Sequence, residues 1–169
     1  MSKINIKKVI LASMFAAVIT VATMIVRFPS PAGYVNLGDG FVLISSWLLG
    51  PVYGSLAAAI GSALADLMSG YAIYMAPTFI IKGLMALCAW AIFTAINKKT
   101  KKRHTLAYVI AAICAELVMV LGYFLTDMLV YDVMIALQCV IANLVQGAVG
   151  ITAGVLMISL INKYNLHEI

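Results

Sequence analysis

Long apolar runs, separated by short polar or glycine-proline breaks, fill most of the chain. A membrane-spanning helix needs about 20 predominantly apolar residues, and runs near this length recur here with only short gaps. The second run is the shortest, and the last is long enough to tilt or to protrude from a bilayer. The pattern therefore predicts six spans. They cover about residues 6–26, 37–49, 52–68, 77–96, 106–126 and 133–161.

The breaks between these runs carry turn chemistry or charge. Residues 28–33 hold two prolines and a glycine, which predicts a loop. Gly50 and Pro51 end the second run, because proline lacks a backbone donor and disfavours helix in the residue before it. The segment 97–104 reads NKKTKKRH and is expected to be aqueous, and 127–132 is expected to form an acidic turn. The connections are therefore short, with no room for a soluble domain.

Composition supports a membrane protein. The chain has 169 residues, of which 64% are apolar and 10% charged, and its mean hydropathy is +1.09. A soluble domain is nearer half apolar and a quarter charged, and one this small could not bury so much apolar surface. These values exclude a soluble enzyme, a disordered chain and a disulfide-stapled module. We expect an all-α integral membrane bundle of six helices, in one domain over 1–169.

The positive charge indicates orientation rather than nucleic-acid binding. The net charge is +5, and a cytoplasmic excess of lysine and arginine sets membrane topology. Six spans place both termini and the basic segment on one side, so both termini are expected in the cytoplasm of a multi-pass plasma-membrane protein. Contact of the basic segment with anionic lipid is an alternative use of the same charge. The cations on this side are Lys3, Lys7, Lys8, Lys98, Lys99, Lys101, Lys102, Arg103 and Lys163.

Four ionisable side chains lie within or at the ends of the expected spans: Asp39, Asp66, Lys82 and Glu116. Such groups are costly in a bilayer and usually functional. Two plainer interpretations stay open. Lys82 would satisfy a buried charge by pairing with Asp66 or Glu116. The two aspartates would simply be helix-end residues near water, since carboxylates favour helix starts.

Helical spacing gathers further polar groups on shared faces. Glu116, Tyr123 and Asp127 are seven and four residues apart, and Asn143 and Gln146 are three apart, so each set shares a face. These faces can meet in the outer half of the bundle, beneath the loop 28–36 as a lid. The sequence thus predicts a pocket for a small polar ligand. Its candidate binding residues are Asn36, Asp39, Tyr74, Lys82, Glu116, Tyr123, Asp127, Asn143 and Gln146.

Sequence motifs for catalysis are absent. No GxxxxGK[ST] phosphate loop, HExxH or GxSxG occurs, and the two histidines lie in the basic segment and the tail. We therefore expect no enzymatic activity, no cofactor and no metal site. The three cysteines, Cys88, Cys114 and Cys139, lie inside apolar runs and are expected to be small core residues.

Small residues recur at three- and four-residue steps in several spans. In lipid, such positions mark close helix contacts. The stripe through Gly54 and Gly61 and the stripe through Gly147 and Gly150 suit internal packing. The pair Ala12 and Ala16 lies in the cytoplasmic half of the first span, where a partner helix could dock instead. The other small residues of the two internal stripes are Ala58, Ser62, Ala65 and Gly154.

Two segments resemble a known transporter family. NLGDGFVLISSWLLGPVYGSLAAAIGSALADLMSGY (36–71) and YMAPTFIIKGLMAL (74–87) are similar to the membrane S components of energy-coupling-factor (ECF) transporters. The similarity is greatest to the riboflavin-type branch, which includes proposed hydroxymethylpyrimidine and pyridoxine carriers. The six-span size, Ala12-xxx-Ala16 and the basic segment match as well. The resemblance implies a high-affinity binder of a vitamin, a vitamin precursor or a metal ion.

The same resemblance implies partners and a mechanism. S components associate with a transmembrane T component and two cytoplasmic ATPases, and they carry ligand inward by reorienting in the membrane. Ala12 and Ala16 match the positions that contact the T component. The ligand site is expected among spans four to six, capped by the loop after span one. We expect a pyridoxine- or pyrimidine-like ligand first and riboflavin second. A stand-alone facilitator and a scaffold without ligand stay open.

Overall fold

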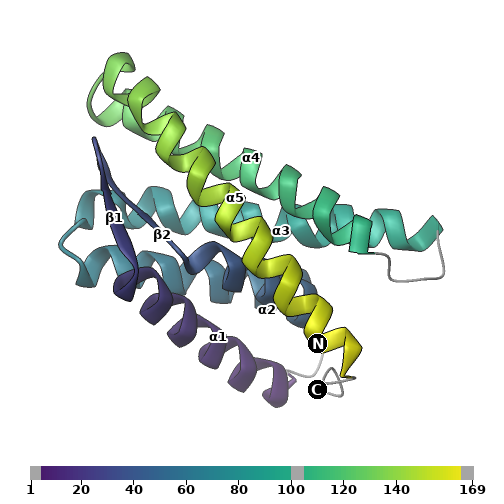
Figure 1. Cartoon of the computed structure of the whole chain (residues 1–169). Coiled ribbons are helices and arrows are strands. Elements are labelled where there is room, and N and C mark those ends of the chain that lie inside the picture. Colours follow the sequence, from purple (N-terminus) through teal and green to yellow (C-terminus); the bar gives the residue numbers. More distant parts are fainter. Residues whose placement is uncertain (1–4, 100–104, 165–169) are drawn as a thin grey trace.

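Five long helices and one short hairpin make up the structure, a computed structural model that describes residues 5–99 and 105–164. Each of the five is long and apolar enough to cross a membrane. The helices are α1 (Ile6–Ile25), α2 (Gly38–Met68), α3 (Met75–Lys99), α4 (Thr105–Val130) and α5 (Val133–Lys163). The strands β1 (Arg27–Ser30) and β2 (Gly33–Asn36) and a 3₁₀ turn, η1 (Ala72–Tyr74), connect them (Figure 1).

The expected count of six spans is not confirmed, and the difference lies in α2. This element joins the second and third expected spans across Gly50, whose φ of 83° is non-helical and suits a residue without a Cβ. The Ser45 hydroxyl donates to the Gly54 carbonyl oxygen over 3.3 Å. Nine residues of straight helix would separate these positions by about 13.5 Å. The two halves of α2 therefore fold back on each other at Gly50 and Pro51.

The segment expected to be a loop forms a two-stranded antiparallel hairpin instead. Arg27 pairs with Asn36 and Ser30 pairs with Gly33, so the two prolines fall in or beside the ribbon. Proline removes a ladder donor, but it is tolerated on edge strands, and both strands of a two-stranded ribbon are edges. The turn residues at 31–32 were correctly predicted, whereas the pairing on either side of them was not.

The expected acidic turn at 127–132 is shorter than predicted. Helix α4 continues to Val130, so Asp127 lies inside its last turn and is buried. Asp132 caps α5, because its carboxylate accepts a hydrogen bond from the Ile135 backbone N–H over 2.9 Å. One aspartate therefore belongs to the interior and the other to the helix end.

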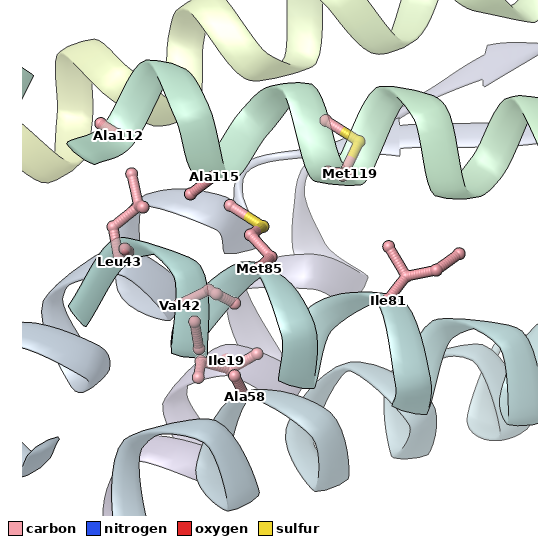
Figure 2. Close-up of a cluster of buried hydrophobic side chains, with 11 residues drawn as sticks. Ile19, Val42, Leu43, Ala58, Ile81, Met85, Ala112, Ala115 and Met119 are labelled. Carbon is pink, nitrogen blue, oxygen red and sulfur yellow. The ribbon is translucent and has the colours of Figure 1, made fainter. Parts of the chain in front are cut away.

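Close helix contacts at small residues build the core. A Cβ added at Gly61 would lie 2.5 Å from the Ala16 carbonyl oxygen, and one at Gly150 would lie 2.8 Å from the Asp39 Cβ. The predicted internal packing of these stripes is confirmed. Figure 2 shows the apolar centre, where side chains from four helices meet. They include Ile19 of α1, Val42, Leu43 and Ala58 of α2, Ile81 and Met85 of α3, and Ala112, Ala115 and Met119 of α4.

The chain reverses at two opposite ends of the bundle. Figure 1 shows the β-hairpin, the α2–α3 connection and the α4–α5 turn at one end, which we call the hairpin end. The start of α1, the end of α3, the start of α4 and the end of α5 lie at the other, the junction end. This arrangement matches the expectation that both ends of the chain share a side. Lys3, Lys101, Lys102 and Arg103, which carried part of that argument, lie outside the described residues.

Candidate functional site

A small polar cavity of about 40 Å³ lies at the hairpin end. Its wall is formed by the hairpin, the end of α2, η1 and the adjoining turns of α3, α4 and α5. Side chains far apart in the sequence therefore converge here. The lining residues are Ser30, Ala32, Gly33, Tyr34, Asn36, Asp66, Tyr71, Tyr74, Thr78, Tyr123, Asp127, Cys139, Asn143 and Gln146.

Two tyrosine–aspartate pairs define the polar character of the cavity. The Tyr34 hydroxyl donates to Asp66 over 2.6 Å, and the Tyr74 hydroxyl donates to Asp127 over 2.6 Å. Such distances are typical of strong hydrogen bonds to a carboxylate. Burial raises the pKa of the Tyr34 phenol, and the Asp66 carboxylate raises this pKa further, so the hydroxyl stays a donor. A carboxylate offers about four acceptor sites, so each aspartate keeps acceptor capacity for a ligand.

Four tyrosine rings surround these carboxylates. The Tyr34 and Tyr71 ring centroids are 5.0 Å apart, and the Tyr74 and Tyr123 centroids are 6.5 Å apart, both pairs tilted. The Tyr123 hydroxyl also lies 3.0 Å from the Thr78 hydroxyl. Tyrosine combines an apolar face with a polar edge. The wall can therefore stack on a flat ring while hydrogen-bonding to its substituents.

Gln146 joins the hairpin to the deeper part of the bundle. Its side-chain oxygen accepts from the Asn36 backbone N–H over 2.9 Å, and its amide nitrogen donates to Asp39 over 2.7 Å. The Asn36 side chain accepts in turn from the Gly38 N–H, which fixes the start of α2. Since Gln146 and Asn36 also line the cavity, the end of the hairpin is held by groups that face the ligand space.

Beneath the cavity, Lys82 forms a fully buried ion pair with Asp39. The sequence-based expectation that Lys82 pairs with Asp66 or Glu116 is therefore wrong. The reason is depth: Lys82 lies one helical turn, about 6 Å, beyond the cavity-lining Thr78, at the level where α2 begins. The expectation that Asp39 is a helix-start residue holds for its position but not for its contact with water, because Asp39 is 0% exposed.

Glu116 belongs to the same deeper level. Its side chain is 4% exposed, and neither carboxyl oxygen has a hydrogen-bond partner. It packs against Gly147 and Gly150 of α5, which leave room for it by lacking a Cβ. Seven residues of helix, about 10 Å, separate it from Tyr123. A shared helix face therefore does not bring Glu116 to the cavity.

The structure divides the predicted binding residues by depth. Asp39, Lys82 and Glu116 do not line the cavity; they form what we call the inner layer. The residues Asn36, Tyr74, Tyr123, Asp127, Asn143 and Gln146 do line it. Asp66 and Cys139 also line the cavity but were not among the candidate binding residues. The sequence does contain a pattern that fits Tyr34, because Tyr34 and Asn36 alternate by two, as residues on one strand face do.

The two alanines expected to dock a partner do not share a free face. Ala16 is 9% exposed and packs its backbone against Gly61 of α2. Ala12 is half-buried. One position further along, Ser13 and Ala17 repeat the same four-residue spacing on the exposed side of α1. Small residues are therefore available to a partner on this helix, at shifted positions.

The chain is similar to known transporter components. The family model described as "ECF-type riboflavin transporter, S component" matches residues 3–163. A protein of Pyrococcus woesei, described as "Uncharacterized protein in gap 3'region", is 34% identical over 139 residues, which cover 80% of this chain and 88% of the relative. A solved structure titled "Structure and mechanism of the S component of a bacterial ECF transporter" aligns with a TM-score of 0.76 at 23% identity, covering 94% and 96% of the two chains.

Proposed function

Because the chain belongs to the ECF-type riboflavin transporter S-component family, we propose that it captures a small water-soluble vitamin or vitamin precursor for an ECF importer. The family is a transporter component and not an enzyme class. The observation that carries the proposal is the cavity at the hairpin end, where two aspartates and four tyrosines from separate elements converge. Convergence of polar groups with a few aromatic walls is typical of a ligand site.

The favoured ligand is a pyridoxine- or hydroxymethylpyrimidine-like ring, and riboflavin is second. Ring nitrogens, amino groups and hydroxymethyl groups match the carboxylates and amides of the wall, such as Asp127 and Asn143. The cavity of about 40 Å³ is smaller than the roughly 300 Å³ or more that ligand pockets usually measure, so it must widen for any of these ligands. The smaller rings require the least widening.

Ligand entry then requires the hairpin to move. Residues of the segment 30–36 line the cavity, and hydrogen bonds of Tyr34 to Asp66 and of Asn36 to Gln146 are among those that hold the hairpin to the bundle. Separation of two strands from the helices costs few apolar contacts compared with separation of helices. We therefore assign the hairpin the role of a lid, facing the outside of the cell, with both termini cytoplasmic. In this topology the two halves of α2 count as separate membrane segments, which gives six.

Transport requires partners: a T component and two cytoplasmic ATPases. We place the T-component contact on the exposed face of α1, through Ser13 and Ala17, with Ala12 at its edge. Ala16 supports that face from behind by packing on Gly61. Ala17→Leu should abolish uptake while leaving ligand binding intact. Ala16→Leu should instead lower stability, because its backbone already touches Gly61. Equal loss of binding in Ala17→Leu would contradict the docking role.

Three measurements test the proposal. Native mass spectrometry of the purified protein should show a co-purified small molecule, or a panel of vitamins and precursors should raise its melting temperature, since a ligand of the folded state stabilises it. The absence of both signals would support a scaffold without a ligand. Uptake into vesicles should require the T component and ATP. ATP-independent equilibration by the chain alone would support the alternative, a stand-alone facilitator.

A further inference from the structure

We infer that the hairpin-end cavity selects a neutral or cationic nitrogen heterocycle rich in hydrogen-bond donors, and that it rejects phosphorylated or carboxylated forms of the same ring. This inference rests on the proposed function, since it specifies the charge of the ligand that the S component would bind. It follows from which charged groups reach the cavity wall and which do not.

The cavity wall carries acids and no base. Asp66 and Asp127 line it, and none of its described lining residues is lysine, arginine or histidine. Two cations border the site without reaching it. Arg27 lies over the Tyr34 ring, 5.4 Å from its centroid, and is itself solvent-exposed. Lys82 lies deeper. An anion entering this space would lose its water and meet two carboxylates, an arrangement that like-charge repulsion disfavours.

Lys82 is not free to serve as the missing base. It is 2% exposed, paired with Asp39, and 5.5 Å from the centroid of the ring of Tyr123, which lines the cavity. A turn of Lys82 toward a ligand anion would leave Asp39 buried and without its counter-ion, which is strongly unfavourable. Lys82 therefore stabilises the floor of the site, with its charge balanced by Asp39.

The two tyrosine–aspartate pairs of the wall present acceptors to a ligand. Two tyrosine hydroxyls direct their protons to Asp66 and Asp127, so their remaining capacity toward a ligand is as acceptors. Asp66 comes from α2 and Asp127 from α4, so acceptors reach the ligand from different helices. A ring with N–H, amino or hydroxyl donors on more than one edge satisfies them, and a phosphate, which offers only acceptors when ionised, does not.

Matched ligand pairs test this directly on the wild-type protein. Pyridoxine would be compared with pyridoxine 5′-phosphate, and 4-amino-5-hydroxymethyl-2-methylpyrimidine with its phosphate, by isothermal titration in detergent. We expect each phosphate to bind at least 100-fold more weakly than its parent. If the parent compounds bind and their phosphates bind with dissociation constants within threefold of theirs, the charge selection is overturned. The proposed function would still stand in that case. No binding by any parent or phosphate would count against both.

Variants locate the discrimination. Asp66→Asn combined with Asp127→Asn keeps the shape of the wall and removes its charge, so we expect the parent-to-phosphate ratio to fall at least tenfold. Asp132→Asn is the matched control, because it removes an exposed carboxylate at the same end and keeps a good helix cap. It should leave the ratio unchanged. An equal fall in both variants would contradict a role for the cavity carboxylates. The wild-type comparison stands even where the double variant does not fold.

Discussion

The cavity at the hairpin end and the inner layer beneath it contain the same kinds of side chain in different states. In the inner layer, Lys82 and Asp39 neutralise each other, and Gln146 completes the hydrogen bonds of the aspartate. In the cavity, Asp66 and Asp127 each accept a hydrogen bond from a neutral tyrosine. None of the described lining residues is a lysine or arginine that would neutralise them.

This difference shows that polarity at membrane depth is not by itself a sign of ligand binding. A paired charge satisfies the fold, whereas a carboxylate with unused acceptor capacity next to a cavity can recognise a ligand. Glu116 fits neither state, since it is buried, without a hydrogen-bond partner, and remote from the cavity. The following changes probe the two layers separately, beginning with the largest expected effect.

Lys82→Met should destabilise the fold by about 3–5 kcal/mol, because it leaves Asp39 as a buried charge without its partner. The measurement is denaturant or thermal unfolding in detergent. Addition of Asp39→Asn to Lys82→Met should recover part of the loss, since the unpaired charge is then gone. Unchanged stability of the single variant would contradict the ion pair.

Asp127→Asn should weaken ligand binding by about 10- to 100-fold. This corresponds to the loss of one hydrogen bond to a charged group, which contributes roughly 1.5–3 kcal/mol. The fold should be retained, because asparagine can still accept from Tyr74. Glu116→Gln is the comparison from the inner layer and should change affinity by less. A larger effect of Glu116→Gln in titrations of ligand would reverse the assignment of the two layers.

Gly150→Ala should cost about 1–3 kcal/mol of stability, as overpacking does, because the new methyl would lie 2.8 Å from the Asp39 Cβ. Gly83→Ala is the matched control in α3. Its methyl would meet Ala59 at an ordinary 3.5 Å, and alanine favours helix over glycine. We expect Gly83→Ala to be neutral or slightly stabilising in the same unfolding experiment. Equal losses would argue against the tight inner layer.

Tyr34→Phe should have the smallest effect, about 0.5–1.5 kcal/mol, since it removes one hydrogen bond between the hairpin and Asp66. If the hairpin is the lid, the ligand should both associate and dissociate faster in stopped-flow measurements. Tyr108→Phe, which alters a tyrosine outside the cavity wall, should leave these rates unchanged. Slower exchange in Tyr34→Phe would contradict the lid.

Much of the fold could be predicted from apolar runs, and much of the site could not. Each predicted run is helical, and the break at Gly50 is where the sequence places it, because glycine and proline act locally. The hairpin was missed because its prolines suppress the strand signal. Periodicity and helical rise place Glu116 and Tyr123 on one face about 10 Å apart, but they do not show which of the two reaches the cavity, since the depth of the cavity is set by how the helices pack. The partner of Lys82 depends on the same packing.

Cys139 offers the most direct test of the central claim, that the ligand binds in the hairpin-end cavity. This thiol lines the cavity, whereas Cys88 and Cys114 do not and can be replaced by alanine. The rate of its modification by a small cationic, membrane-impermeant methanethiosulfonate would be measured in right-side-out vesicles, with and without saturating ligand. We predict modification from the outside that bound ligand slows at least tenfold. An unchanged rate with ligand bound would contradict the account.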